Sequence, residues 1–250
     1  MKRTNILIVA AAMIFAPACK APPPEETLAG KLGDLMEEVP EPPALDVVAP
    51  EAAVTIDRNQ FVSVVQVNLD PAESVPEHDA SPSAVYAVTD IVLEKNDGES
   101  GETITLAGGE AATWNAGRYE LVNAGESGAE MVVVARTAER LSAAVEMAEQ
   151  AEGESPGIPA ESQPSALAAS DYFRVRQVAV EAGVERRVVC EHPCSVYTLT
   201  AASIEVPRYD ETVEAMDVFE KRALWFDWQS EFTVNAGEQP VALAVFEVLQ

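Results

Sequence analysis

The sequence contains two related halves, and this duplication constrains the fold more than any other feature. FVSVVQVNLDPAE begins at Phe61, and YFRVRQVAVEAGV begins 111 positions later at Tyr172. Further pairs share this offset: VYAVT and VYTLT, Trp114 and Trp225, Glu120 and Glu231. The sequence NAGE also recurs, one residue later than the offset requires. Matches held in one register over this distance indicate a tandem duplication.

The residue pattern of both halves is that of short β-strands. Apolar, mostly β-branched side chains alternate along residues 61–69, and further apolar runs follow between turn sequences that contain glycine. In the first half strands are expected at 61–69, 84–94, 103–106, 111–114, 119–122 and 130–135. The NAGE segments predict hairpin turns in which glycine adopts a positive φ. The pattern as a whole predicts an all-β sandwich or barrel in each half.

Composition shifts divide the chain into five segments. Residues 1–18 form a signal peptide, and residues 19–53, rich in proline and glutamate, form an extended tether. The two strand-rich units are expected at 54–137 and 170–250. Residues 138–169 between them are expected to hold a short helix and a proline-containing linker.

The first residues resemble a bacterial export signal. Lys2 and Arg3 precede an apolar run from Ile6 to Phe15, which is too short to span a bilayer. The sequence FAPAC that ends at Cys19 resembles a lipobox, in which the cysteine is lipidated and becomes the new N-terminus. We therefore expect a lipoprotein that faces the periplasm and is attached to the outer membrane, since Lys20 follows the cysteine.

An ordinary cleavage after Ala18 is the alternative, and it would give a soluble secreted or periplasmic protein. The chain has three cysteines, Cys19, Cys190 and Cys194. Lipidation of Cys19 leaves an even pair, which is the usual state of cysteines in an exported protein. Cysteine parity therefore favours the lipoprotein.

The charge of the chain excludes one class of partner. The formal net charge is -26, from 42 acidic and 16 basic side chains. Nucleic acids require a basic surface, and so does electrostatic attachment to anionic lipids. We expect no nucleic-acid partner. Membrane contact is expected through the lipid anchor alone, and an unidentified small molecule or envelope protein is the remaining partner class.

Two segments of the first half resemble the conserved motifs of the cupins. GGEAATWNAGRYELVNAGE, residues 108–126, is similar to the second cupin motif, with Gly109 and Gly117 in the places of its glycines. DPAESVPEHDASPSAVYAVTD, residues 70–90, resembles the first motif. The resemblance extends to the duplicated half. It implies an all-β bicupin, with two tandem jelly-roll barrels in one chain.

The resemblance does not extend to the metal site of the family. Cupin metal sites use three histidines and a glutamate, a ligand set suited to iron or manganese. In the first half His78 is the remaining histidine, Glu120 stands where the second motif has its histidine, and Ser83 lies near the place of the glutamate. In the second half Glu231 and Cys194 take the equivalent places. We therefore expect no metal and no other cofactor.

Several residues of the two halves are candidates for ligand contact. His78 lies between two acidic residues in a proline-bounded segment, which favours a solvated loop histidine over a ligand contact. Glu120 and Glu231 recur at equivalent positions, as ligand contacts would, although exposed carboxylates are common on strands. Trp114 and Trp225 are expected to anchor the cores.

The stretch Cys190 to Cys194 has two competing interpretations. On an extended strand the two cysteines would lie about 13 Å apart, beyond the Cα separation of about 4.4 to 6.8 Å that a disulfide tolerates. Pro193 favours a turn, which would allow a disulfide-closed loop. A reduced pair and a soft-metal site that includes His192 are the alternatives. We expect the disulfide.

The sequence leaves three functional classes open. The first is a non-catalytic, lipid-anchored binding or interaction module of the cell envelope, which the tether and the incomplete metal sites favour. The second is a divergent cupin enzyme of the dioxygenase or isomerase type. The third is a structural envelope protein. No nucleophile with a plausible base and no phosphate-binding loop is visible in the sequence, so no catalytic residue is predicted.

Overall fold

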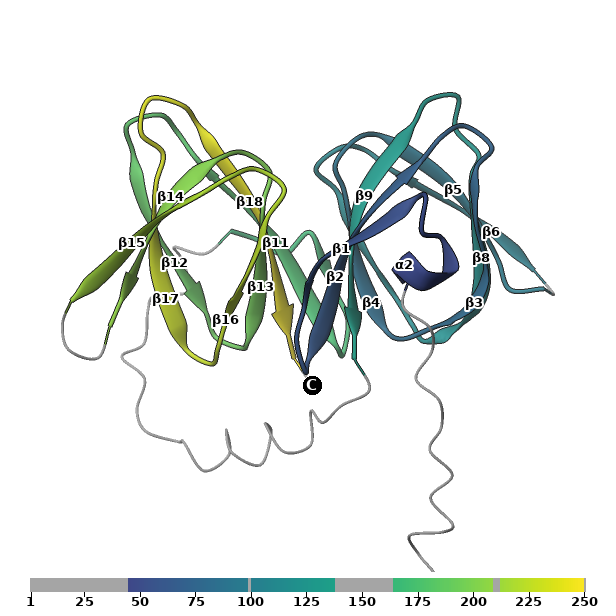
Figure 1. Cartoon of the computed structure of the whole chain (residues 1–250), viewed down its shortest axis with the longest axis horizontal. Helices are drawn as coiled ribbons and strands as arrows, with labels where there is room; N and C mark the ends of the chain where they lie inside the picture. The colour runs from purple at the N-terminus through teal and green to yellow at the C-terminus, as the bar shows by residue number, and fades with distance from the viewer. Residues whose placement is uncertain (1–44, 99, 138–163, 209–211, 250) are drawn as a thin grey trace, which may run out of the picture. The chain divides into compact units, whose positions relative to one another are not determined.

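The computed structural model describes residues 45–98, 100–137, 164–208 and 212–249, and in this part the chain forms two sets of antiparallel strands (Figure 1). The first set follows a short helix, α2, at Leu45–Val48. Its strands are β1 Ala53–Arg58, β2 Val62–Leu69, β3 Ser74–Ala80, β4 Ser83–Ala87, β5 Ile91–Asn96, β6 Gly101–Leu106, β7 Ala111–Trp114, β8 Gly117–Asn123 and β9 Ala129–Arg136.

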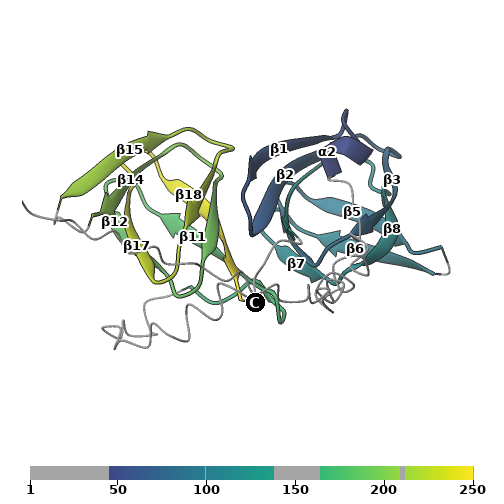
Figure 2. The same ribbon diagram turned by 60° about the horizontal axis from the view of Figure 1, so that its bottom comes forward.

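The second set repeats the first strand for strand. Its members are β10 Ala168–Ala169, β11 Phe173–Val180, β12 Glu185–Cys190, β13 Cys194–Thr198, β14 Ala202–Pro207, β15 Val213–Val218, β16 Ala223–Phe226, β17 Ser230–Asn235 and β18 Val241–Val248. Each set closes around its own interior, as Figures 1 and 2 show. The predicted all-β architecture is confirmed.

Strand order shows that the two barrels share one topology. In the first barrel a five-stranded sheet has the order β1-β2-β9-β4-β7 and a four-stranded sheet the order β3-β8-β5-β6. In the second barrel the orders are β10-β11-β18-β13-β16 and β12-β17-β14-β15. Adding nine to each strand number of the first barrel gives the strand order of the second barrel. The duplication read from the sequence is therefore also a duplication of the sheet topology.

Several local predictions differ from the structure. The expected strand 84–94 is two strands, β4 and β5, which belong to different sheets. The bend between them is held by the Thr89 hydroxyl, which accepts a hydrogen bond from the Glu130 backbone at 2.9 Å. Strands β1 and β3 were not predicted, because Pro76 and several charged side chains interrupt the apolar alternation of β3.

The NAGE segments are also not hairpin turns, because each joins two different sheets, β8 to β9 and β17 to β18. Of their glycines only Gly237 has a positive φ, of 56°. In both segments the asparagine side chain turns the backbone, since Asn123 and Asn235 each accept a hydrogen bond at 3.0 Å from the amide of the glycine two residues on.

Each barrel has an apolar interior, and the outer faces of the two five-stranded sheets form a third core. Alternation along one strand shows the division: Val65 and Val67 of β2 face the first interior, whereas Val62 and Val64 belong to the third core. This shared core joins residues of both barrels: Val62, Val64, Ala84, Tyr86, Val132, Val134, Phe173, Val175, Tyr197, Ala244, Phe246 and Val248. Fully buried aromatic side chains supply much of its area.

Polar and aromatic contacts surround the shared core. The Phe61 and Trp225 rings stack with centroids 5.3 Å apart, and the Arg136 guanidinium lies 5.0 Å from the centre of the Tyr172 ring. Lys221 forms an ion pair with Glu130 at 2.7 Å. Each of these contacts joins the two barrels, so in the described ranges the two five-stranded sheets cover each other's outer faces.

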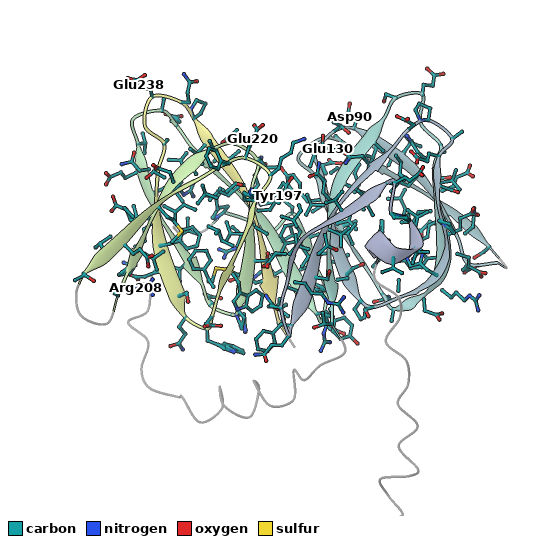
Figure 3. All side chains as sticks on the ribbon, in the orientation of Figure 1. Asp90, Glu130, Tyr197, Arg208, Glu220 and Glu238 are labelled. Atoms are coloured by element: carbon teal, nitrogen blue, oxygen red, sulfur yellow. A yellow bond between two sulfur atoms is a disulfide. The ribbon has the colours of Figure 1, made fainter. Side chains whose placement is uncertain are left out.

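Tyr197 lies at the acidic end of the shared core, near Glu130 and Glu220 (Figure 3). Burial raises the pKa of Tyr197 to about 12, and the two carboxylates add to this shift. The phenol is therefore neutral at physiological pH.

The expected signal peptide, the tether and the linker helix lie outside the described residues. No helix in the described ranges is long and apolar enough to cross a membrane.

Candidate functional site

One row of side chains crosses the five-stranded sheet of the first barrel on its inner face. The ladder pairs Arg58 with Ser63, Ser63 with Ala135, Ala135 with Ser83, and Ser83 with Trp114. Directly paired residues point to the same side of a sheet, so these five residues share one face. We call them, together with His78 and Tyr119 of the opposite sheet, the first-barrel row.

The first-barrel row lines a cavity of about 70 Å³. The pair His78 and Tyr119 closes it from the four-stranded sheet, where the two residues are ladder partners. Its remaining walls are mainly apolar and include Val65, Val67, Val75, Leu121 and Val133. A single water needs only about 10–15 Å³, so the cavity has room for several waters or for a small organic molecule.

His78 lies on strand β3 and is only 6% exposed, so the prediction of a solvated loop histidine is wrong. A register shift between Val75 and His78 turns the ring inward. The imidazole Nδ1 donates to the Pro76 carbonyl at 2.8 Å, because a carbonyl oxygen can only accept. In the neutral ring this leaves the lone pair on Nε2.

Three buried polar atoms of the row have no hydrogen-bond partner. They are the hydroxyls of Ser63 and Ser83 and the indole nitrogen of Trp114. These side chains are 8%, 2% and 7% exposed. An unsatisfied buried polar group costs about 1–3 kcal/mol, and native proteins leave few of them without a protein, water or ligand partner. Three such atoms lie around one cavity, where a water or a polar ligand can satisfy them.

Tyr119 supplies a further neutral hydroxyl. Burial raises the pKa of Tyr119 to about 12, and the Ser83 hydroxyl opposes this shift. The Tyr119 ring packs edge to face against His78 and Trp114, with centroids 5.3 and 6.0 Å away. Lys95 places its ammonium 4.6 Å from the ring centroid. These contacts fix the ring, so the phenol is a positioned hydrogen-bond donor.

The two candidate glutamates lie away from the barrel interiors. On β8 the buried residues are Tyr119, Leu121 and Asn123, and Glu120 between the first two does not line the cavity. On β17 Phe232 faces the core, whereas Glu231 is partly exposed and pairs with Arg187. The structure therefore brings His78, Ser83 and Trp114 together but places Glu120 and Glu231 on the other face of their strands.

The second barrel has an equivalent row with different chemistry. Its ladder pairs Ala169 with Arg174, Arg174 with Glu247, Glu247 with Cys194, and Cys194 with Phe226. On the opposite sheet Cys190 pairs with Ser230, as His78 pairs with Tyr119. In this second-barrel row the cysteines stand where the first barrel has His78 and Ser83.

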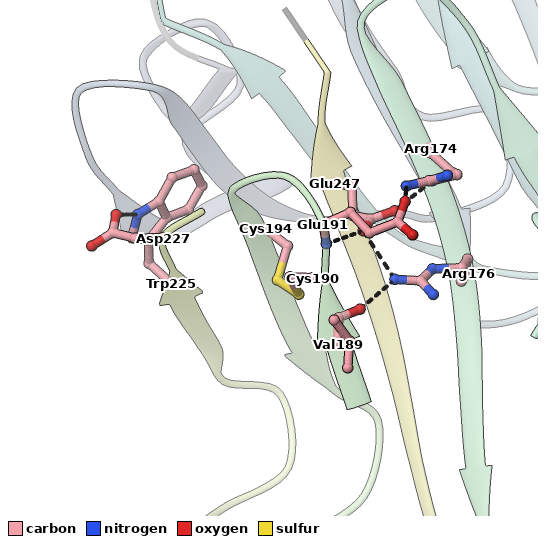
Figure 4. Close-up of a disulfide and its surroundings, with 9 residues drawn as sticks. All are labelled: Arg174, Arg176, Val189, Cys190, Glu191, Cys194, Trp225, Asp227 and Glu247. Atoms are coloured by element: carbon pink, nitrogen blue, oxygen red, sulfur yellow. Dashed lines mark hydrogen bonds and ion pairs between the residues drawn. A yellow bond between two sulfur atoms is a disulfide. The ribbon is translucent and has the colours of Figure 1, made fainter. Parts of the chain in front are cut away.

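The charged groups of the second-barrel row pair with one another (Figure 4). The carboxylate of Glu247, with an exposed fraction of 0%, accepts from Arg174 at 2.5 Å, from Arg176 at 3.0 Å and from the Glu191 amide at 3.1 Å. Arg176 also donates to the Val189 carbonyl at 2.9 Å. The buried charges are thus paired, as they must be to remain charged in an apolar interior.

Cys190 and Cys194 form a disulfide, with Cα atoms 6.1 Å apart, well within the range that a disulfide allows. The chain turns between them, and because β12 and β13 belong to different sheets the bond joins the two sheets of the second barrel. Closing so short a loop contributes about 2 kcal/mol in the chain-entropy model.

We predict that this bond is present in the native protein. No basic residue lies between the two cysteines, so a tryptic peptide that contains both should be two hydrogens lighter than its reduced form when no reductant is used. Mass spectrometry of protein purified from its native source without reductant measures this difference. Two free thiols would contradict the disulfide, and thiols protected by a bound metal would favour the soft-metal alternative.

The described residues do not fit a metal centre of the cupin kind. In these ranges no group of three or more histidine, cysteine, aspartate or glutamate side chains is placed to hold a metal ion. The first-barrel row contributes one imidazole, and its other members are serine, alanine, tryptophan, tyrosine and arginine. We therefore derive no function through a metal.

Comparison with known proteins gives a fold and no family assignment. No family model matches the sequence, and no curated protein matches it. Among solved structures, oxalate decarboxylase from Bacillus subtilis at pH 4.6 matches with a TM-score of 0.57 and 14% identity, over 78% of this chain and 70% of that chain. The fold is of the cupin type.

A second structure, which describes the substrate binding mode of oxalate decarboxylase, has a TM-score of 0.56 and 13% identity over 78% of this chain and 71% of that one. Oxalate decarboxylase from Bacillus subtilis is an enzyme with Mn(II) centres. At this level of identity the likeness concerns the fold alone. The residues that line the cavity of this protein are not the three histidines and one glutamate of a cupin metal site.

Sequence reasoning missed Ser63, Tyr119 and Arg58 as members of the site. It also paired Trp114 with Trp225, whereas the ladder register places Phe226 in the position equivalent to Trp114. Trp114 is buried in the first core as expected, but Trp225 packs in the shared core against Phe61. The repeat offset gave no signal for this, because Ser230 and Tyr119 keep the offset of 111 whereas Phe226 and Trp114 are 112 positions apart.

Proposed function

We propose that this protein is a lipid-anchored cell-envelope protein whose first barrel binds a small molecule without converting it, while the second barrel is structural. The observation that carries the proposal is the contrast between the two rows. Around the first cavity Ser63, Ser83 and Trp114 have buried polar atoms without partners. In the second row the corresponding places hold a buried ion pair and a disulfide.

Binding is favoured over catalysis by the chemistry of the cavity. Tyr119 has a pKa of about 12 and holds its proton at physiological pH, so it acts as a donor rather than as a base. His78 is the one imidazole, and its Nδ1 is engaged by the backbone. Such a set can orient a ligand. The divergent cupin enzyme and the structural envelope protein remain the competing functions, and the test below separates them.

Filling the cavity should abolish binding without unfolding the barrel. Ser83→Leu adds apolar volume at the centre of the first-barrel row, next to Ala135 and Trp114. We expect the dialysable fraction of the native envelope to raise the melting temperature of the wild-type protein and to leave that of Ser83→Leu unchanged. Circular dichroism measures both temperatures, and ligand at a hundred times its dissociation constant would add about 2.7 kcal/mol.

Arg187→Leu is the matched control, because Arg187 lies on an exposed outer face of the second barrel. This variant should respond to the fraction as the wild type does. Equal shifts in wild type and Ser83→Leu would place the ligand elsewhere, and no shift in any protein would refute the binding function. Chemical conversion of a component by the wild type alone would instead support the enzyme.

Replacing Cys19 with alanine should release the protein into the soluble fraction. A diacylglyceryl group and an amide-linked chain on Cys19 together give stable membrane attachment, whereas a single chain does not. The measurement is the distribution of wild type and Cys19→Ala between the membrane and soluble fractions of the envelope. The proposal of a lipid anchor fails if both forms sediment with membranes equally.

A further inference from the structure

We propose that the first barrel takes a small neutral molecule with a carbonyl group, a short primary amide, which bridges the two serines of the first-barrel row. This inference rests on the proposed binding function and names the ligand class for the same cavity. Three features carry it: buried donors that lack partners, charged groups of both signs beside the cavity, and a small volume with an apolar wall.

The cavity presents hydrogen-bond donors that need an acceptor. The Trp114 indole nitrogen can only donate, and it is buried without a partner. Its ladder partner Ser83 also has a buried, unpartnered hydroxyl on the same inner face. A carbonyl oxygen has two lone pairs and no proton, so one such oxygen can accept from both neighbours.

The spacing of the two serines fits a planar group with a polar atom at each end. Ser63 and Ser83 flank Ala135 in the row, so their strands lie about 9.5 Å apart. Side chains inside a closed barrel converge, which brings the hydroxyls nearer to each other. A primary amide separates its oxygen and nitrogen by about 2 Å, and with a hydrogen bond of about 2.9 Å at each end it spans about 8 Å. The carbonyl oxygen then lies near Ser83 and Trp114, and the amide nitrogen donates to the Ser63 oxygen.

Charged groups beside the cavity disfavour a ligand of either sign. Asp79 is an exposed carboxylate of the lining and repels an anion. The arginines of the lining do not offset it, because Arg136 lies over a tyrosine ring and the exposed Arg58 has an interaction of its own. A cation is opposed by the Lys95 ammonium, which lies 4.6 Å from the centre of the Tyr119 ring. An uncharged ligand avoids the cost of moving an ion from water into a largely apolar cavity.

The volume of the cavity sets the size of the ligand. The cavity measures about 70 Å³, and one water occupies about 30 Å³ of the liquid, so the space equals two to three waters. Acetamide, with four non-hydrogen atoms, has about this size. The wall beyond the row is apolar, with Val65 and Val133 side by side and Val75 opposite Leu121, and it receives the methyl group.

Three planar compounds of nearly equal shape separate the ligand classes. Acetamide is neutral, acetate is an anion and acetamidinium is a cation. Saturation-transfer NMR on the unmodified protein detects the methyl group of each compound when it is bound. We expect transfer to acetamide, absent in Ser83→Leu, and at least about tenfold weaker binding of both ions.

Trp114 fluorescence gives the dissociation constants. The variant Trp225→Phe plus Trp228→Phe leaves Trp114 as the sole tryptophan, because the chain has three. In this background we expect acetamide to change the fluorescence with saturation and a dissociation constant on the order of 1 mM, as suits a ligand of four atoms.

Two serine variants test the bridging geometry. Ser63→Ala removes the acceptor of the amide nitrogen and should weaken acetamide binding about three- to tenfold. Ser195→Ala is the matched control, because Ser195 has an equally buried and unpartnered hydroxyl but lies on β13 of the second barrel, outside the cavity lining. It should leave binding unchanged.

Two results would overturn the inference and leave the binding function intact. One is binding of acetate or acetamidinium as tight as that of acetamide, and the other is a dissociation constant for Ser63→Ala equal to that of Ser195→Ala.

The two proposals fail in distinguishable ways. If none of the three compounds binds, but envelope small molecules still stabilise wild type and not Ser83→Leu, the cavity binds another class and this inference is wrong. If that stabilisation is absent too, water satisfies the buried donors and the binding function fails with the inference.

Discussion

Replacement of Glu247 by leucine should lower the free energy of unfolding by about 3–5 kcal/mol. Glu247 is completely buried and is the partner of Arg174 and Arg176. Arg176 is itself only 3% exposed, so the substitution removes the carboxylate that pairs with its guanidinium in the interior. Urea unfolding followed by circular dichroism measures the loss.

Two further variants make this prediction specific to the buried charge. Glu231→Leu removes the carboxylate of an exposed pair with Arg187 and should cost less than about 1 kcal/mol. Combining Glu247→Leu with Arg176→Met removes both buried charges and should recover most of the loss, because well-packed apolar replacements of a buried pair are often neutral. If Glu247→Leu lowered the free energy of unfolding no more than Glu231→Leu does, the buried charge of Glu247 would not contribute to stability in this way.

Replacement of Phe246 by alanine should cost about 3–5 kcal/mol and should separate the unfolding of the two barrels. Phe246 is fully buried in the shared core, between strands of the second barrel and beneath those of the first. Deleting its ring leaves a cavity where the two five-stranded sheets meet. In the wild type we expect one cooperative transition, because each sheet depends on the other to cover its outer face.

Probes in the two barrels can detect this separation. The fluorescence of Trp114, in the background that lacks the other two tryptophans, reports the first barrel, and circular dichroism reports both. Phe232→Ala is the control, since Phe232 is equally buried but lies inside the second barrel alone. Coincident transitions in Phe246→Ala would show that the shared core does not couple the barrels.

The sequence was sufficient to predict an all-β, duplicated chain from strand alternation and internal repetition, and the resemblance to the cupin motifs implied the cupin fold. It was not sufficient for β3, whose proline and charged residues hide the alternation, or for the turn that separates β4 from β5. The shared core was also invisible, since residues such as Val62 and Val64 alternate with Val65 and all of them are apolar.

The candidate site was predicted in part, for a reason that lies in strand geometry. His78 was identified as a candidate, but its burial depends on a bulge that sequence does not reveal. Glu120 was chosen from motif alignment, whereas its neighbour Tyr119 faces the cavity. Successive side chains on a strand point to opposite faces, so an error of one residue exchanges the inside of a barrel for its outside.

The order of strands also bears on association between copies of the chain. Strands β6 and β15 end their four-stranded sheets, so each leaves a row of backbone groups unpaired within the described fold. Such edges promote intermolecular strand addition and aggregation. Here they carry acidic side chains, among them Glu102 and Asp217, which repel the same edge of another molecule. Acidic side chains at these two edges thus oppose edge-to-edge strand pairing between copies.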